Sequence, residues 1–428
     1  MLRMIVVGGG WAGCAAALAA RKAGAEAILV ERADTLLGSG QVGGIMRNNG
    51  RFTATEEMIA MGAGELFHLA DKNARHANIE FPGHRHASLY DVSHMEPMVR
   101  TYLQEQGVEI WVVARVNKAH LGDGAIRAVE LTSGPIIEGD VFVDTTGSMG
   151  PMGNCSRYGN GCAMCITRCP SFGGRVSLAK CAGVEEYKGV RPDGGVGAMS
   201  GSCKLNKDSL APAVRRELDN KGVVIIPVPK AMALAKENLL DLKCCQQYAL
   251  KEFAENVVIL DTGHAKLMAP FYPLMELRKI PGLQDARYED PYAGGLGNSI
   301  RFLAMSPRED TLRIKGVRNL FGAGEKVGPL VGHTEAICTG TLAGHNAVRL
   351  ALGLPLVTYP LETAVGEFVA FSGREVEKPE GRVKKFTFSG ALFFERMRAL
   401  DLYTTDVAVI RQRVQRVGWH HFFTPPLA

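Results

Sequence analysis

This 428-residue sequence lacks any run of 18 uninterrupted apolar residues, so it offers no candidate for a membrane-spanning helix. A signal peptide is not expected either. No charged stretch, apolar run and cleavage site come before the first strand-like segment, Met4 to Val7. The sequence also shows no internal repeat and no long low-complexity linker. We therefore expect a soluble, cytoplasmic, globular protein that does not enter a membrane.

A strong excess of one charge is also absent. Lys and Arg number 49 against 44 for Asp and Glu, which gives a net charge of +5. This excess is too small to indicate nucleic-acid binding, although it suits an anionic cofactor or substrate. The hydrophobic content of 46% is enough for a large core. Ten cysteines in a cytoplasmic chain indicate metal or redox chemistry rather than disulfides.

The segment from Met4 to Glu31 has the pattern of a strand, a glycine-rich turn, a helix and a second strand. The turn, Gly8 to Gly13, fits G-x-G-x-x-G directly after an apolar strand and before the Ala-rich segment Cys14–Lys22. In this motif the first glycine makes the tight turn, the second lets the backbone approach a pyrophosphate, and the third allows close packing. The sequence therefore predicts a dinucleotide site.

Three further segments indicate which dinucleotide binds. Glu31 ends the second strand, where an acid accepts hydrogen bonds from the adenosine ribose and disfavours the NADP phosphate. Val141–Gly147 and Asn319–Glu325 are similar to segments that hold FAD in many flavoenzymes. No second dinucleotide motif for NAD is visible. The predicted cofactor is FAD, and its predicted binding residues are Gly8, Gly10, Trp11, Ala12, Gly13, Glu31, Arg32, Gly43, Gly44, Val116, Thr146, Gly147, Gly324 and Glu325.

Candidate catalytic residues follow the late FAD segment. A helix from about His333 to Leu352 would direct its N-terminus at the flavin and stabilise the reduced, anionic form. His333 is the best candidate for a general acid, Glu335 lies in the same first turn, and Lys326 directly follows Glu325.

Four cysteines lie close together in the sequence, in the pattern Cys155-x6-Cys162-x2-Cys165-x3-Cys169-Pro170. The later part matches the bacterial ferredoxin spacing, so we predict a [4Fe–4S] cluster. Structural zinc, a redox-active dithiol and plain buried thiols remain alternatives. The fourth ligand is Cys155 or a more distant thiol. The distant candidates are Cys181, Cys203, Cys244 and Cys245.

The sequence resembles the flavoproteins that modify tRNA uridines, the GidA and folate-dependent TrmFO-like proteins. The similar segments are Val6–Ala16, Gly43–Ile45, Ile280–Leu283, Gly322–Ala347 and Thr363–Gly366. The resemblance implies the FAD scaffold and an activity on tRNA. Those enzymes work through cysteine, and residues 39–45 contain none here.

We predict an α/β fold: a two-lobe, FAD-binding, Rossmann-like domain of the glutathione-reductase type with an inserted substrate domain and a helical C-terminal tail. The expected FAD-binding domain comprises residues 1–150 and 310–353, the Cys-rich substrate domain 151–309, and the tail 354–428. Within the first domain we expect helices over about 56–73 and 93–106, the latter capped by Ser93.

The function predicted from these features is an FAD-dependent oxidoreductase. Its iron–sulfur cluster would pass electrons between flavin and ferredoxin or another electron-transfer subunit, and the flavin would reduce or oxidise a small-molecule substrate. Two alternatives remain, a tRNA uridine-modifying enzyme and a non-catalytic electron-relay subunit. A homo-oligomer is compatible with the sequence.

Overall fold

The computed structural model describes residues 2–158, 168–200, 203–234, 250–268, 273–289 and 299–427. At its centre is a five-stranded parallel sheet with the order β17-β10-β1-β2-β6. The strands are β1 (Arg3–Val7), β2 (Glu26–Val30), β6 (Glu109–Trp111), β10 (Val141–Asp144) and β17 (Leu320–Gly322). Continuous apolar runs form β1, β2 and β10 because a parallel sheet is covered on both faces. The predicted Rossmann-like α/β fold is confirmed.

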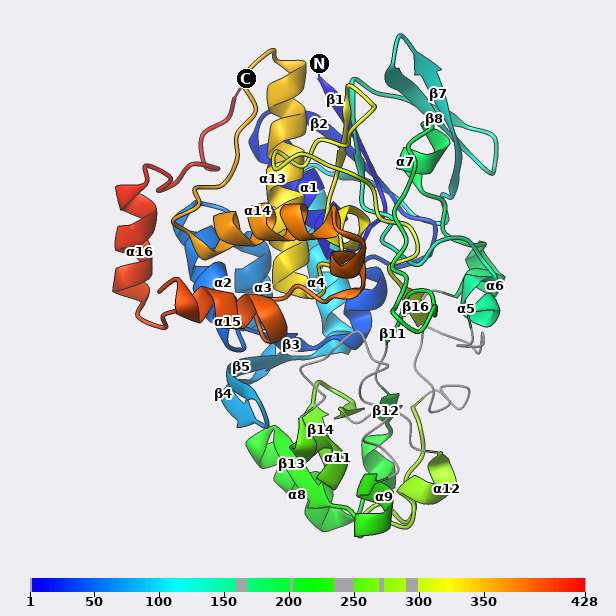
Figure 1. The fold of residues 1–428 in the computed structure, drawn as a ribbon, viewed down its shortest axis with the longest axis vertical. Coiled ribbons are helices and arrows are strands. Elements are labelled where there is room, and N and C mark those ends of the chain that lie inside the picture. Colours follow the sequence, from blue (N-terminus) through cyan, green and yellow to red (C-terminus); the bar gives the residue numbers. More distant parts are fainter. Residues whose placement is uncertain are drawn as a thin grey trace.

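Two helices from distant parts of the chain pack against each other beside this sheet: α1 (Trp11–Lys22) and α13 (His333–Ala351) (Figure 1). Their contact depends on two glycines of α13. A Cβ atom on Gly340 would lie 2.2 Å from the Ala12 carbonyl oxygen, and one on Gly344 would lie 2.2 Å from that of Ala16. The two helix backbones therefore approach as closely as glycine alone permits.

Small antiparallel sheets surround this core. One contains β3 (Ile45–Met46), β4 (Ala74–Phe81) and β5 (His84–Tyr90), and another contains β7 (Val116–Gly122), β8 (Ala125–Leu131) and β9 (Ile136–Glu138). The strands β11 (Ala198–Ser200) and β16 (Ser299–Arg301) form a pair. The short helices α5 (Asn154–Arg157), α6 (Cys169–Phe172) and α7 (Leu178–Cys181) precede β11 in the chain.

A second lobe lies below the main body in Figure 1. Its sheet has the order β12-β15-β14-β13, with β12 (Cys203–Leu205), β13 (Val223–Pro227), β14 (Asn256–Asp261) and β15 (Ala265–Leu267). Its helices are α8 (Pro212–Lys221), α9 (Lys230–Leu234), α11 (Lys251–Glu255) and α12 (Leu274–Leu277). The lobe has its own apolar core, and a separate apolar cluster joins β14 to β5 of the main body.

The C-terminal part packs on the main body through α14 (Ala364–Val376), α15 (Ala391–Ala399) and α16 (Val407–Arg416). It is tied there by Glu57, a fully buried carboxylate on α2 (Gly50–Ala60). Glu57 accepts hydrogen bonds from the Ala364 and Val365 backbone N–H groups and pairs with Arg413 at 3.2 Å. Burial of the charged form is the main influence on this carboxyl group, and it raises the pKa of Glu57.

Two predictions about helices were wrong in detail. The single helix expected over 56–73 is two helices, α2 and α3 (Glu65–Lys72), because Gly62 between them has a φ of +82° that ends the first. The helix α4 (Val92–Glu105) is capped by Asp91, whose carboxylate accepts from the Ser93 N–H at 2.9 Å, and not by Ser93 itself.

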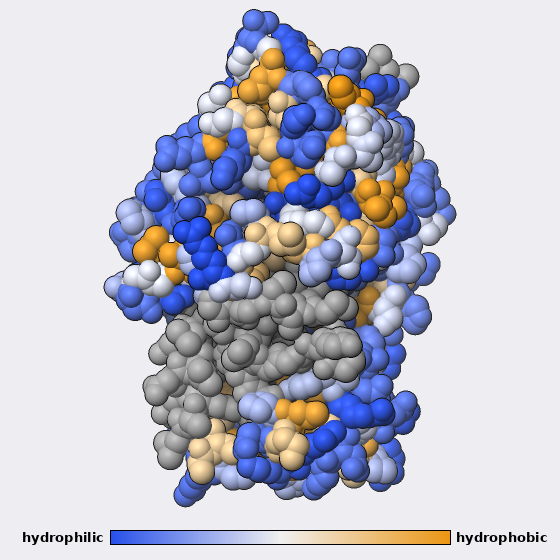
Figure 2. All heavy atoms as spheres, turned by 90° about the vertical axis from the view of Figure 1, so that its right-hand side faces the viewer, coloured by the Kyte–Doolittle hydropathy of each residue, from blue (hydrophilic) through white to orange (hydrophobic). Residues whose placement is uncertain are grey.

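None of the helices in the described part of the chain is both long and apolar enough to cross a membrane. Hydrophobic side chains are scattered among hydrophilic ones over the described part of the face in Figure 2.

We predict that Gly340→Ala destabilises the protein by about 1–3 kcal/mol, because the added methyl group overlaps the Ala12 carbonyl oxygen, which belongs to the backbone of α1. Urea denaturation would measure the loss. Arg216→Ala, at an exposed position of α8, is the control and should change stability by less than about 0.5 kcal/mol. Equal stability of both variants would contradict the close packing of α1 on α13.

Candidate functional site

A cavity of about 270 Å³ opens at the carboxyl ends of the parallel strands. This is the edge where α/β proteins of this type bind their ligands. Most of the residues predicted for the cofactor line it together with His333. They are Gly8, Gly10, Trp11, Ala12, Glu31, Arg32, Gly43, Val116, Thr146, Gly147, Gly324 and Glu325. Segments from distant parts of the sequence therefore meet at one site.

The glycine turn has the shape that the sequence motif predicts. Gly8 has a φ of +106°, and a Cβ atom on Gly13 would lie 1.9 Å from the Gly8 carbonyl oxygen, so Gly13 serves the packing and not the cavity lining. At Gly10 a Cβ atom would meet nothing within 4 Å. No side chain in the described part of the chain caps α1 after Gly10. Its free N–H groups and the space before them suit a pyrophosphate.

Glu31 braces this turn from the end of β2. Its Oε2 accepts from the Gly9 N–H at 2.7 Å and its Oε1 accepts from the Ala33 N–H at 2.8 Å. The carboxylate also lines the cavity, so its remaining lone pairs are available to ribose hydroxyl groups. We call this part of the cavity, lined by Gly8, Gly10, Glu31 and Arg32, the Glu31 end.

Basic side chains outnumber acidic ones in the lining. Arg175, which sequence reasoning missed, donates to the Thr146 carbonyl oxygen at 3.0 Å. Burial, followed by repulsion from Arg32 and Arg301, lowers the pKa of Arg175 below its ordinary value. The guanidinium groups thus create a field that favours an anionic ligand. Arg175 lies well beyond Gly147 in the sequence, and no local motif marks it.

Glu325 stands where the late motif places it, in the short 3-10 helix η4 (Gly324–Val327). Its carboxylate accepts from the Ser148 hydroxyl group at 2.9 Å and forms an ion pair with Arg301. Gly324 donates its N–H to the Thr339 hydroxyl group at 3.0 Å, which fixes η4 on α13.

His333 begins α13 at the other part of the cavity. A Cβ atom on Gly43 would lie 1.8 Å from its Cε1, and its Nδ1 lies 3.2 Å from the Tyr90 hydroxyl oxygen. The centroid of its ring lies 5.7 Å from the centroid of the Trp11 ring. We call this part, lined by Gly43, Lys266, Arg301 and His333, the His333 end.

Burial holds the pKa of His333 well below its ordinary value, and the charges of Arg51, Lys266 and Arg301 lower it further. The imidazole is therefore neutral at physiological pH. It can donate one N–H hydrogen bond or accept a proton, but it does not carry the positive charge of a resting imidazolium acid.

Lys326 does not line the cavity. Its side chain is fully buried, donates to the Ala304 carbonyl oxygen at 3.0 Å and forms an ion pair with Glu186 at 2.5 Å. The chain turns through η4 directly after Glu325, so adjacent residues face different sides of the loop. Lys326 therefore lies in the protein interior, away from the cavity lining where a catalytic role was predicted.

Glu335 also lies outside the cavity lining. Its Oε1 accepts from the Arg51 guanidinium at 3.0 Å, from the Thr387 hydroxyl group at 2.6 Å and from the Phe388 N–H at 2.9 Å. Two residues advance a helix by about 200°, so Glu335 faces away from the side that His333 faces.

The cysteine cluster is only partly described. Cys155 lies on α5 and Cys169 begins α6, whereas Cys162, Cys165, Cys244 and Cys245 lie outside the described residues. Within the described ranges, no group of three or more His, Cys, Asp or Glu side chains is arranged to hold a metal ion. The iron–sulfur site stays a prediction.

We predict that His333 takes up its proton at a lower pH than an ordinary histidine, because burial and the nearby cations hold its pKa well below the ordinary value of 6.5. Carbon-13 NMR of the histidine rings would follow it, with His333→Gln identifying the signal. A signal that titrates near pH 6.5 would contradict the burial and the cationic surroundings described above.

The family described as "Glucose inhibited division protein A" matches residues 3–211 and 272–355. The tRNA-(uracil-5-)-methyltransferase TrmFO of Synechococcus sp. is 43% identical over 96 residues, which is 22% of this chain and 20% of that protein. The enzyme of the same name from Thermus thermophilus is 36% identical over 108 residues, or 24% and 23% of the two chains. These matches span about a fifth of each methyltransferase.

Among solved structures, GidA of Aquifex aeolicus superimposes with a TM-score of 0.64 in one crystal form and 0.59 in another. The first comparison has 15% sequence identity and covers 97% of this chain and 76% of that one. Such a likeness establishes the shared fold. Because the family pattern covers more than half of the residues, this chain belongs to the glucose inhibited division protein A family.

Proposed function

We propose that this chain is an FAD-dependent enzyme and that the cavity between α1 and α13 holds the cofactor. The observation that carries the proposal is the convergence of two helix N-termini and the Glu31 carboxylate on one cavity. The open space at Gly10 fits a pyrophosphate, and Glu31 fits a ribose. A dinucleotide with its adenosine at the Glu31 end would reach the His333 end with its flavin.

FAD supplies two-electron redox chemistry when it is bound. The protein contributes binding, orientation and a fixed electrostatic field. The N-terminus of α13 brings a partial positive charge to the His333 end, and Lys266 adds a full charge there, whereas the charge of Arg301 is partly offset by its ion pair with Glu325. The neutral His333 ring offers a hydrogen bond or accepts a proton beside them, with Tyr90 fixing its orientation.

For the substrate we propose a uridine in tRNA, in place of the small molecule first predicted. Family membership and the similarity to tRNA methyltransferases support this substrate. Residues 39–45 carry no cysteine, so a covalent step on uridine would use a thiol from another part of the chain.

The cysteine segment is proposed as a metal site, with a [4Fe–4S] cluster first and zinc second. The residues around Cys169 lie beside the Glu31 end of the cavity. Arg168 forms an ion pair with Asp34, and the Gly173 carbonyl oxygen accepts a hydrogen bond from Arg32 at 2.9 Å. A redox-active cluster there would exchange electrons with flavin and with ferredoxin or another electron-transfer subunit.

We predict that the purified protein contains about one FAD per chain and that Gly10→Ala and Gly10→Val lose it progressively. The Ala side chain projects into open space, so both variants should fold, but each fills room that the pyrophosphate needs. We expect at least tenfold weaker FAD binding for Ala, about 1.4 kcal/mol, and no retained FAD for Val. Absorbance and fluorescence measure the flavin. Unchanged FAD content in Gly10→Val would contradict the assigned site.

Iron, acid-labile sulfide and zinc should be measured on the same anaerobic preparation. About four irons and four sulfides per chain would support the [4Fe–4S] cluster. A preparation that contains zinc but no iron or sulfide would assign the cysteine segment to structural zinc. A protein with FAD and no metal would contradict both proposals for the cysteine segment.

The tRNA proposal predicts a uridine derivative in unmodified tRNA incubated with the protein, a flavin reductant and methylenetetrahydrofolate. Mass spectrometry of the digested tRNA detects the product, and Gly10→Val provides the control without flavin. The proposal fails if the flavin-loaded protein leaves every uridine unchanged and does not bind tRNA.

A further inference from the structure

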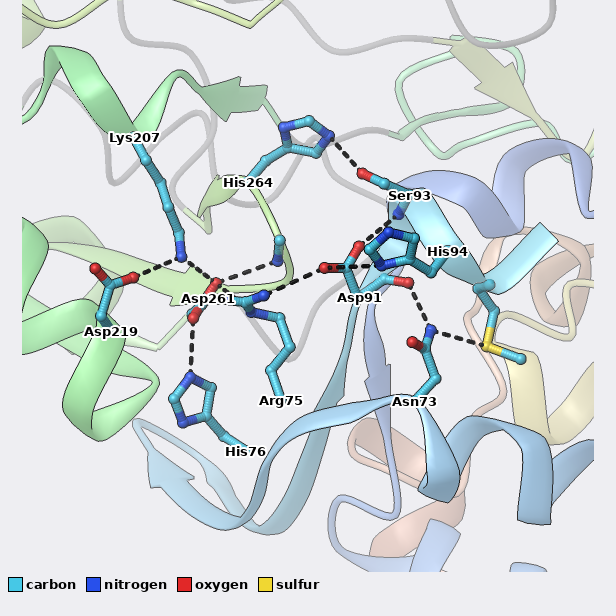
Figure 3. Close-up of polar contacts among 12 residues, drawn as sticks. Asn73, Arg75, His76, Asp91, Ser93, His94, Lys207, Asp219, Asp261 and His264 are labelled. Atoms are coloured by element: carbon cyan, nitrogen blue, oxygen red, sulfur yellow. Dashed lines mark hydrogen bonds and ion pairs between the residues drawn. The ribbon is translucent and has the colours of Figure 1, made fainter. Parts of the chain in front are cut away.

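The hairpin formed by β14 and β15 is anchored to the main body by a buried carboxylate. Asp261, at the end of β14, is fully buried and contacts Arg75 and His76 of β4 at 3.0 and 2.9 Å. Lys207 of the second lobe pairs with the same carboxylate at 2.6 Å (Figure 3). Because removing one partner from a buried ionic group is unfavourable, these contacts hold the hairpin in a fixed place.

The turn of the hairpin packs against the loop formed by residues 38–44, which lines the cavity in part. A Cβ atom on Gly44 would lie 2.4 Å from Cγ2 of Thr262, and the Thr262 carbonyl oxygen accepts from the Val92 N–H at 3.0 Å. Gly44 has a φ of +77° and does not line the cavity. The predicted cofactor residue Gly44 thus serves the contact with the second lobe.

Two lysines of the second lobe reach the same loop. Lys204 of β12 and Lys266 of β15 are register partners. Lys204 donates to the Gln41 carbonyl oxygen at 3.3 Å, whereas Lys266 donates to the Gly43 carbonyl oxygen at 2.6 Å and also to that of Val42. Their ammonium groups therefore bind three consecutive carbonyl groups, and Lys266 lines the cavity while Lys204 does not.

We propose that Lys266 supplies a fixed positive charge to the His333 end of the cavity and thereby stabilises reduced flavin. This inference rests on the proposed function, because it concerns the FAD assigned to the same site. The second lobe thus completes the redox site of the first.

The proposed stabilisation is electrostatic. Reduction by two electrons and one proton leaves a negative charge on the flavin ring, and a nearby cation lowers the free energy of that state. Lys266 is only 5% exposed, so water screens its charge weakly. Its charge acts at the His333 end, where it helps to lower the pKa of His333.

The test compares Lys266→Met, Lys266→Arg and the matched control Lys204→Met as FAD-loaded proteins. Anaerobic reduction against a reference dye gives the midpoint potential, and a titration with sulfite gives a second readout because sulfite addition also leaves a negative charge on flavin. For Lys266→Met we expect the equilibrium constant for flavin reduction to fall at least tenfold. For a two-electron couple this lowers the midpoint potential by about 30 mV. Sulfite affinity should also fall about tenfold.

Lys266→Arg keeps the charge and should stay within threefold of the wild type in both readouts. Lys204→Met removes a loop contact of the same kind without removing a charge from the cavity, and it should leave both readouts unchanged. If Lys204→Met lowers the midpoint potential and the sulfite affinity as much as Lys266→Met does, the lysines act only by holding the loop and the inference is wrong. Wild-type protein that binds no FAD would instead overturn the proposed function, whereas FAD with an unchanged potential in Lys266→Met overturns this inference alone.

Discussion

The contact between α1 and α13 is the constraint on which the site depends. Gly340 and Gly344 bring the α13 backbone against the carbonyl oxygens of Ala12 and Ala16, and this fixes the relative position of both helices. Each helix begins at the cavity without a side-chain cap from the described residues. Two sets of free N–H groups are therefore aimed at one ligand, although one comes from residue 11 and the other from residue 333. A larger residue in place of either glycine would separate these two N-termini.

Part of the site could be predicted from sequence because its geometry is local. The turn Gly8–Gly13 and Glu31 lie within one strand–helix–strand unit, whose spacing alone places them. The start of α13 was also predicted correctly, and His333 lines the cavity.

Adjacency in sequence was a poorer guide at Lys326 and Glu335. Lys326 follows a cavity residue directly, and Glu335 lies shortly after another, yet both side chains point into buried ion pairs. The direction of a side chain depends on the local turn and on the helical phase. Arg175 was missed as a cavity residue for the opposite reason, since tertiary packing alone brings it to the site.

The charges around the cavity link binding to stability. Arg32, Arg175, Arg301 and Lys266 converge on a space that two carboxylates, Glu31 and Glu325, only partly neutralise. Each carboxylate already serves the protein, Glu31 by bracing the glycine turn and Glu325 by pairing with Arg301. Burial first, and then repulsion from Arg32 and Arg301, lowers the pKa of Arg175 in the folded chain. A pyrophosphate bound there would offset this repulsion, and a ligand that binds the folded state in preference to the unfolded one stabilises the fold that creates its site.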